Sequence, residues 1–129
     1  MNTSILVVDD SATVRKFVSV SLEMQGFKVI TATDGMDALE KMSRENVALI
    51  ITDLNMPNMD GLELIASIRE NPLYAELPVI ILSSLDEMPN KEKVASLRVS
   101  SYLKKPFNIE RIQYEVSKHL SWSALETTH

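Results

Sequence analysis

The sequence contains no cysteine, which excludes disulfides, thiolate zinc sites, iron–sulfur ligation and cysteine nucleophiles and fits a reducing compartment. Glycine is scarce, with three residues, proline occurs five times, and no window is biased in composition. Collagen-like, repeat-built and largely disordered chains are thereby excluded. Because 129 residues suit one globular domain and are too few for two, we expect a single domain with one core.

Long hydrophobic runs are also missing. The longest, Val47 to Ile51 and Pro78 to Leu82, fall far short of the roughly 20 residues that span a bilayer, so we expect no membrane helix. Asp9 and Asp10 interrupt the first apolar run after four residues, so we expect no secretory signal and a cytoplasmic protein. Thirteen Lys and Arg against eighteen Asp and Glu give a net charge of -5, which argues against nucleic-acid binding.

Short apolar runs alternate with longer stretches of helical period, a pattern typical of repeated strand–helix units. We therefore predict an α/β domain whose parallel sheet is covered by helices on both faces. The predicted strands are Ile5 to Val8, Lys28 to Thr31, Ala48 to Thr52, Val79 to Leu82 and Ser101 to Leu103.

Helices are predicted between and after these strands. Ser11 is a suitable N-cap for the first helix, and Gly26 follows its end. The fourth helix is predicted to be short and to begin near Pro89, because proline inside a helix removes a backbone hydrogen bond. The residues predicted on the apolar faces of the other four are Val14, Phe17, Val18, Leu22 and Gln25, then Gly35, Ala38, Leu39 and Met42, then Leu62, Ile65 and Ile68, and finally Ile109, Ile112, Val116 and Leu120.

The domain is predicted to span residues 1–121 and to be followed by a polar tail at 122–129. Seven methionines occur in the chain, and Met24, Met36 and Met42 are predicted to fill the core rather than to form a recognition surface.

Polar residues follow four of the predicted strands. Asp9 and Asp10 follow the first strand, Asp53 the third and Ser83 the fourth, and Lys105 comes two residues after the fifth. Because the carboxyl ends of parallel strands meet at one edge of the sheet, we expect these side chains to converge. Crowded carboxylates either raise a pKa or recruit a cation, and oxygen ligands without His or Cys suit Mg²⁺ better than zinc. A lysine and a hydroxyl at the same point suit a phosphoryl group.

The segments around these residues resemble the receiver domains of two-component response regulators, most closely the single-domain CheY type. The resemblance covers nearly the whole chain and implies a doubly wound five-stranded parallel sheet of order 2-1-3-4-5 with five helices. It rests on VVDDS at 7–11, DLNMPNMDGLEL at 53–64, PVIILS at 78–83 and YLKKPF at 102–107.

The resemblance implies a role for each acid. Asp53 corresponds to the phosphoacceptor, and Asp10 and Asp53 correspond to Mg²⁺ ligands together with the backbone carbonyl of Asn55. Asp9 corresponds to the outer-shell acid that holds a metal-bound water. Asp10 could instead have only a structural role as a cap of the following helix, but the presence of two further acids argues against this alternative.

The resemblance also implies a switch. Ser83 and Lys105 would bind the phosphoryl oxygens, and Ser83 would move inward and vacate space into which Tyr102 rotates. The binding surface formed by helix four, strand five and helix five would change as a result. The Lys105-Pro106 peptide bond is a candidate cis bond.

The implied function is that of a stand-alone receiver that accepts a phosphoryl group from a histidine kinase on Asp53 and signals by binding a downstream protein. Such a chain is a signalling protein and not an enzyme, beyond its own phosphoryl transfer and autodephosphorylation. The sequence leaves the oligomeric state open, with a monomer favoured, and it names neither the kinase nor the target.

Three other classes were weighed. A phosphohydrolase with an aspartyl nucleophile needs a second Asp two residues after the first, where this chain has Ser11. A flavin carrier needs a phosphate loop where this chain has two acids. A pseudo-receiver, which binds partners without phosphorylation, is the serious alternative, although such chains usually lose an acid or the lysine.

The chain departs from the family pattern at several positions. Ser84 replaces a small apolar residue, Arg98-Val99 replace the usual Gly-Ala, and Pro89 disturbs the start of helix four. Leu85 stands where a polar side chain would orient the hydrolytic water, which predicts a longer-lived phosphorylated state than in a Leu85→Glu or Leu85→Gln variant.

Overall fold

The computed structural model describes residues 3–83 and 95–120. Five parallel strands in these ranges form one sheet of order β2-β1-β3-β4-β5, which confirms the predicted fold class and strand order. The strands are β1 (Thr3–Val8), β2 (Lys28–Ala32), β3 (Asn46–Asp53), β4 (Val79–Ser83) and β5 (Ser101–Lys104). The helices are α1 (Ala12–Glu23), α2 (Gly35–Met42), α3 (Gly61–Glu70) and α5 (Ile109–His119), with a 3₁₀ helix, η1 (Pro72–Tyr74), after α3.

The four described α-helices correspond to the first, second, third and fifth predicted ones. The fourth predicted helix near Pro89, the residues Ser84 and Leu85, and the predicted tail at 122–129 lie outside the described residues. The longest helix in the described ranges, α1, has 12 residues, and none of the helices there has the length and apolar run of a bilayer crossing.

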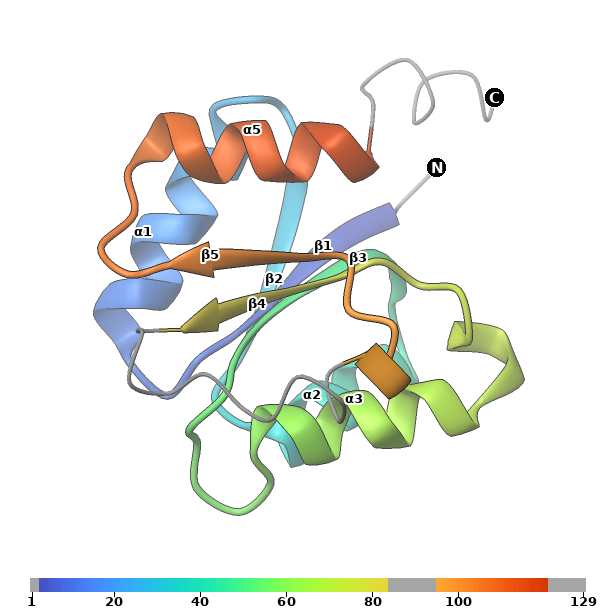
Figure 1. The fold of residues 1–129 in the computed structure, drawn as a ribbon. Helices are drawn as coiled ribbons and strands as arrows, with labels where there is room; N and C mark the ends of the chain where they lie inside the picture. Colours follow the sequence, from blue (N-terminus) through green and yellow to red (C-terminus); the bar gives the residue numbers. More distant parts are fainter. Residues whose placement is uncertain (1–2, 84–94, 121–129) are drawn as a thin grey trace.

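The sheet separates two layers of helices, with α1 and α5 on one face and α2 and α3 on the other (Figure 1). Side chains alternate along each strand, so Ile5 and Val7 of β1 pack with α1 and α5, whereas Leu6 and Val8 pack with α2 and α3. A strand that is buried on both faces has apolar residues at every position, which explains the continuous apolar run at its sequence.

Helix starts are set by polar side chains that bond free backbone N–H groups. The hydroxyl of Ser11 accepts from Val14 N at the start of α1, as predicted. Asp60 forms a capping box with Glu63 at the start of α3. At the other end of α1, Gly26 has φ 93°, a conformation that glycine adopts without strain. Because β1 and β3 are parallel neighbours, the loops that follow them leave the same edge of the sheet.

Three side chains that we expected in the core are exposed. Phe17 is 40% exposed, Met24 66% and Met36 57%, and only Met42 of the three methionines is buried. Phe17, Val20 and Met24 recur at a spacing of three and four residues, so they share a stripe of α1 that is turned away from the sheet. The sheet covers only the side of α1 that carries Val18 and Leu22.

Candidate functional site

Three carboxylates meet at the carboxyl edge of the sheet. Asp53 is the last residue of β3, and Asp9 and Asp10 follow the neighbouring strand β1. Because Val8 and Thr52 are partners in the parallel pairing of these strands, the residues that follow them emerge side by side. One carboxylate oxygen from each of the three acids lies within 4.8 Å of the others. Asp9 and Asp53 are buried, whereas Asp10 is exposed.

The two carboxylate oxygens of Asp9 differ in hydrogen bonding within the described residues. Its Oδ1 accepts a hydrogen bond from Ser11 N at 2.8 Å, whereas its buried Oδ2 has no hydrogen-bond partner within the described ranges. Burial, with smaller contributions from Asp53 and Asp10, raises the pKa of Asp9 to about 6, although the Ser11 N–H and Lys105 act in the opposite direction.

This donor set fits a hard divalent cation. The three acids supply only oxygen ligands, and the orphaned Oδ2 of Asp9 is a buried acceptor that a cation or its water would satisfy. A cation would also offset the repulsion among the carboxylates. Mg²⁺ therefore suits these residues better than a metal that prefers nitrogen or sulfur ligands.

A lysine that follows β5, the strand at the edge of the sheet, also reaches the group of acids. The Lys105 Nζ lies 3.7 Å from Oδ1 of Asp53, and that oxygen also accepts a hydrogen bond from Leu54 N at 2.8 Å. The backbone N–H of Lys105 donates to the carbonyl of Ser83 at 2.8 Å, which joins the ends of β4 and β5. Ser83 is fully buried. The Lys105-Pro106 peptide bond is cis, as the sequence suggested.

The loop after Asp53 turns sharply, and Gly61 makes this turn possible. Its N–H donates to the carbonyl of Leu54 at 2.9 Å. A Cβ at position 61 would lie 2.2 Å from the backbone oxygen of Asp53, which leaves no room for any side chain there. Asn55, which the resemblance assigns to the metal through its carbonyl, is an exposed residue of this loop.

Tyr102 lies in β5, where it is paired with Ile81 of β4. The side chain is half-buried and packs with the cluster on the α2 and α3 face, beside Leu97 and Val99. Burial raises the pKa of its phenol.

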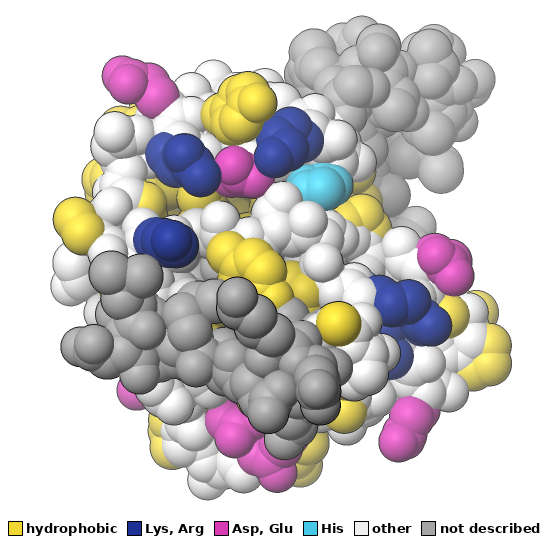
Figure 2. Space-filling view, viewed as in Figure 1, with side chains coloured by type: hydrophobic (Ala, Val, Ile, Leu, Met, Phe, Trp, Pro, Cys, Tyr) yellow, Lys and Arg dark blue, Asp and Glu magenta, His cyan; other side chains and the backbone are white. Residues whose placement is uncertain are grey.

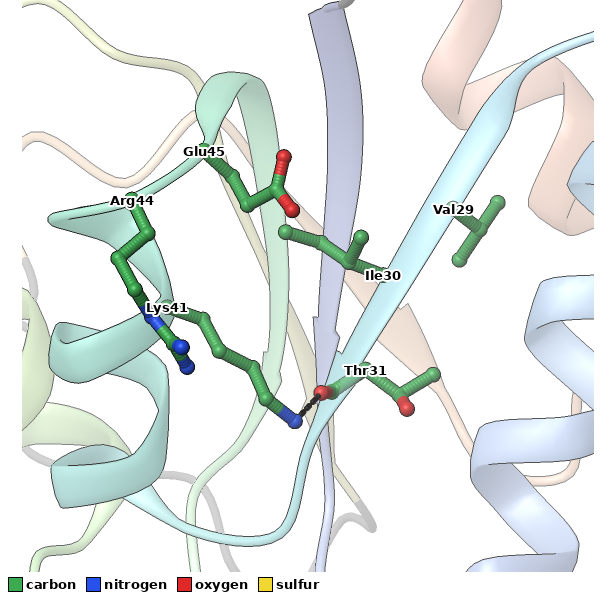
Figure 3. Close-up of a pocket in the computed structure, with 6 residues that line it drawn as sticks. All are labelled: Val29, Ile30, Thr31, Lys41, Arg44 and Glu45. Atoms are coloured by element: carbon green, nitrogen blue, oxygen red, sulfur yellow. Dashed lines mark hydrogen bonds between the residues drawn. The ribbon is translucent and has the colours of Figure 1, made fainter.

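A cavity of about 450 Å³ lies elsewhere, between α2 and the edge strand β2 (Figure 3). Its cationic side chains are already engaged, because Lys41 bonds the carbonyl of Thr31 and the carboxylate of Asp37, and Arg44 pairs with Glu40. The cavity does not adjoin the three acids. It offers no cation free to hold an anionic ligand.

One residue near the site escaped the sequence analysis. Asp34 is a buried acid whose side chain caps α2 and also accepts a hydrogen bond from Asn58 in the loop after Asp53. The sequence pair Asp34-Gly35, just before a helical pattern, could have indicated that Asp34 is the N-cap of α2. The second hydrogen bond joins positions 24 residues apart, and no local pattern indicates it.

The chain matches the family model of the response regulator receiver domain over residues 5–117. Among curated proteins, it is 37% identical over 116 residues to protein PilG of Pseudomonas aeruginosa, a match that covers 90% of this chain and 86% of PilG. It is 34% identical over 125 residues to the alkaline phosphatase synthesis transcriptional regulatory protein PhoP of Bacillus subtilis. That match covers 97% of this chain and 51% of PhoP, so the chain spans about half the length of that relative.

Solved structures show the same likeness. The chemotaxis response regulator CheY4 of Vibrio cholerae has a TM-score of 0.85 and 32% sequence identity, with 93% of this chain and 100% of that chain covered. The family match over most of the chain, the strand order and the group of three acids all agree. The chain therefore belongs to the response regulator receiver domain family and has the CheY-like fold.

Proposed function

We propose that this chain accepts a phosphoryl group on Asp53 from a phosphohistidine of a histidine kinase, with Mg²⁺ as cofactor. The observation that carries the proposal is the group of Asp9, Asp10 and Asp53, with Lys105 Nζ 3.7 Å from Asp53. Receiver domains are signalling proteins that interact with histidine kinases and downstream targets, and they generally bind Mg²⁺ at an acidic pocket.

The metal would be held by Asp10, Asp53 and the backbone carbonyl of Asn55, with Asp9 binding it through water. When bound, Mg²⁺ supplies positive charge for the oxygens of the transferring phosphoryl group. The acids would also bind the cation before any phosphoryl group is present, because the repulsion among crowded carboxylates favours cation binding.

In the transfer, an oxygen of Asp53 forms a bond to phosphorus while the bond between phosphorus and the imidazole nitrogen of the donor breaks. The electron pair of that bond leaves with the imidazole, and Asp53 becomes an aspartyl phosphate. Lys105 balances negative charge on the phosphoryl oxygens, and its position next to Asp53 supports this role. Leu54 N–H holds Oδ1 of Asp53 in place.

We propose that Ser83 and Tyr102 transmit the change to the surface. Ser83 ends β4 and pairs with Lys104 of β5, and Tyr102 lies two residues before Lys104 in the same strand. The output surface would include β5 and α5, over which Figure 2 shows basic side chains around one acidic side chain. On α5, the buried Glu115 pairs with Arg111 at 3.4 Å and with Lys118 at 3.3 Å.

We further propose that the receiver spans residues 1–121 with a tail at 122–129, and that it acts in the cytoplasm.

The test is the intact mass of the chain after incubation with a small-molecule phosphodonor, with and without Mg²⁺, beside an Asp53→Asn variant. We expect the mass of one phosphoryl group to be gained only when both Mg²⁺ and Asp53 are present. No gain, under conditions that label a known receiver, would overturn the proposal and favour a phosphorylation-independent interaction module.

A further inference from the structure

The loop that follows Asp53 is hydrogen-bonded to the N-terminus of α2, a helix that takes no part in the site. In this loop, the side-chain amide of Asn58 donates from Nδ2 to Oδ2 of Asp34 at 2.7 Å. Asn58 has φ 67°, in the left-handed region that Asn tolerates better than other side chains except glycine. The hydrogen bond therefore joins a residue with a left-handed backbone conformation to the N-terminus of α2.

Asp34 is itself held firmly. Its Oδ1 accepts from Asp37 N at 2.8 Å as the N-cap of α2, and the residue is buried. These hydrogen bonds, that of the Asp37 N–H first and that of Asn58 second, hold the pKa of Asp34 below its usual value. Asp34 is therefore a charged acceptor with a fixed position, and a hydrogen bond to such an acceptor is stronger than one between neutral groups.

A second contact fastens the next residue of the loop. The N–H of Gly35 donates to the carbonyl of Met59 at 3.1 Å, and a Cβ at position 35 would lie 2.6 Å from Cγ of Met59. The loop is also closed at its base by the hydrogen bond from Gly61 N to Leu54 O. Asn55 thus lies on a segment that is fixed at its base and near its tip.

We propose that Asp34 and Asn58 are positioning residues that hold the loop bearing Asn55 in place and thereby set the affinity of the site for Mg²⁺. The inference rests on the proposed function, in which the carbonyl of Asn55 is a metal ligand. A loop that is already ordered loses little conformational entropy when a cation binds, whereas a loosened loop must be ordered at the expense of affinity.

The test compares metal affinity in Asn58→Gly and in the parent chain. Glycine adopts the left-handed backbone without strain and removes the Asn side chain together with its hydrogen bond to Asp34. We expect the dissociation constant for Mn²⁺, measured by electron paramagnetic resonance without a phosphodonor, to rise about fivefold, the size that loss of one side-chain hydrogen bond imposes on an equilibrium. Phosphoryl uptake should need more Mg²⁺ for half-saturation, with an unchanged rate at saturating Mg²⁺.

Two further variants separate positioning from general stability. Asn71→Gly removes an Asn side chain that accepts from Leu73 N in a loop before η1, and it should leave the Mn²⁺ affinity unchanged. The exchanged pair Asp34→Asn with Asn58→Asp keeps one donor and one acceptor at the contact and should restore most of the affinity that Asn58→Asp alone loses.

The outcomes distinguish the two proposals. A parent chain that binds Mn²⁺ while Asn58→Gly binds it equally well, within twofold, overturns the positioning role alone. A parent chain that binds no Mn²⁺ overturns the proposed function and the positioning role together. An equal loss of affinity in Asn58→Gly and Asn71→Gly also overturns the positioning role, because it assigns the effect to stability.

Discussion

The ammonium group of Lys105 and the carboxylate of Asp53 face each other across the carboxyl edge of the sheet, with 3.7 Å between Nζ and Oδ1. The two residues come from β5 and β3, which are separated by β4. Within the acidic group, Lys105 supplies positive charge, and it lowers the pKa of Asp9 as well. The 3.7 Å between Nζ and Oδ1 is longer than a hydrogen bond, so the two groups form an ion pair.

Replacing Lys105 should impair phosphoryl uptake. In a Lys105→Met variant the charge that balances the phosphoryl oxygens is lost, and we expect the initial rate with a small-molecule phosphodonor at saturating Mg²⁺ to fall about 10- to 100-fold. Lys104→Met is the matched control, because Lys104 is the exposed neighbour on β5. Equal rates in the Lys105 and Lys104 variants would contradict the assignment.

The pH dependence of stability should carry the signature of Asp9. Its pKa is about 6 in the folded, metal-free protein and about 3.8 in the unfolded chain, so the neutral form is favoured by folding. The stabilising contribution is complete below pH 4 and is lost as the pH rises through 6. In EDTA, Asp9→Asn should therefore raise the free energy of unfolding at pH 7.5 by about 1 to 3 kcal/mol, and by much less at pH 4.

Urea unfolding at the two pH values measures this effect. Glu70→Gln, which changes an exposed acid at the end of α3, serves as the control and should show no such dependence on pH. Added Mg²⁺ should stabilise the parent chain more than Asp9→Asn, because binding to the folded state is linked to stability. A gain at pH 4 equal to that at pH 7.5 would refute the titration of Asp9.

The two crowded glycines should differ in their tolerance of alanine. A Cβ at position 61 would meet the backbone oxygen of Asp53 at 2.2 Å, and backbone cannot move aside without distorting the site. We expect Gly61→Ala to cost about 2 to 4 kcal/mol of unfolding free energy and to weaken Mn²⁺ binding. In Gly35→Ala the nearest atoms are side-chain atoms of Met59, Cγ at 2.6 Å and Cβ at 2.8 Å, and none is backbone of the site, so the cost should be smaller than that of Gly61→Ala. Equal costs would contradict this reading.

Arg69 should prove more important for stability than its half-exposed position suggests. Its guanidinium donates to four backbone carbonyls, those of Leu97 and Arg98 before β5 and those of Tyr74 and Ala75 at the end of η1, and this joins the two segments. Arg69→Leu should lower the free energy of unfolding by about 2 to 3 kcal/mol, since hydrogen bonds to charged groups are among the stronger ones. Arg44→Leu, which breaks only an exposed pair with Glu40, should cost less than about 0.5 kcal/mol. Thermal and urea unfolding of both variants measures these free energies, and equal losses in the two variants would contradict the prediction.

Much of the fold follows from local pattern. The buried strands contain continuous apolar runs, and Ser11 and Gly26 mark the ends of α1, so the element order could be predicted. Strand limits were less certain. β3 begins at Asn46, two residues before its predicted start, because pairing with β1 extends the strand beyond the apolar run. The exposed positions of Phe17 and Met24 were missed, because the side of a helix that the sheet covers depends on packing.

The sequence by itself determined which residues are available for chemistry. Asp9, Asp10, Asp53 and Lys105 follow strand ends, and a parallel sheet brings all such positions to one edge. Only the tertiary structure decided how these groups are held and how they titrate. The raised pKa of Asp9, the contact of Asn58 with Asp34 and the hydrogen bonds of Arg69 to Leu97 and Arg98 depend on segments far apart in the chain. Burial and hydrogen bonding between distant loops are set when the layers pack, and no spacing in the sequence encodes them.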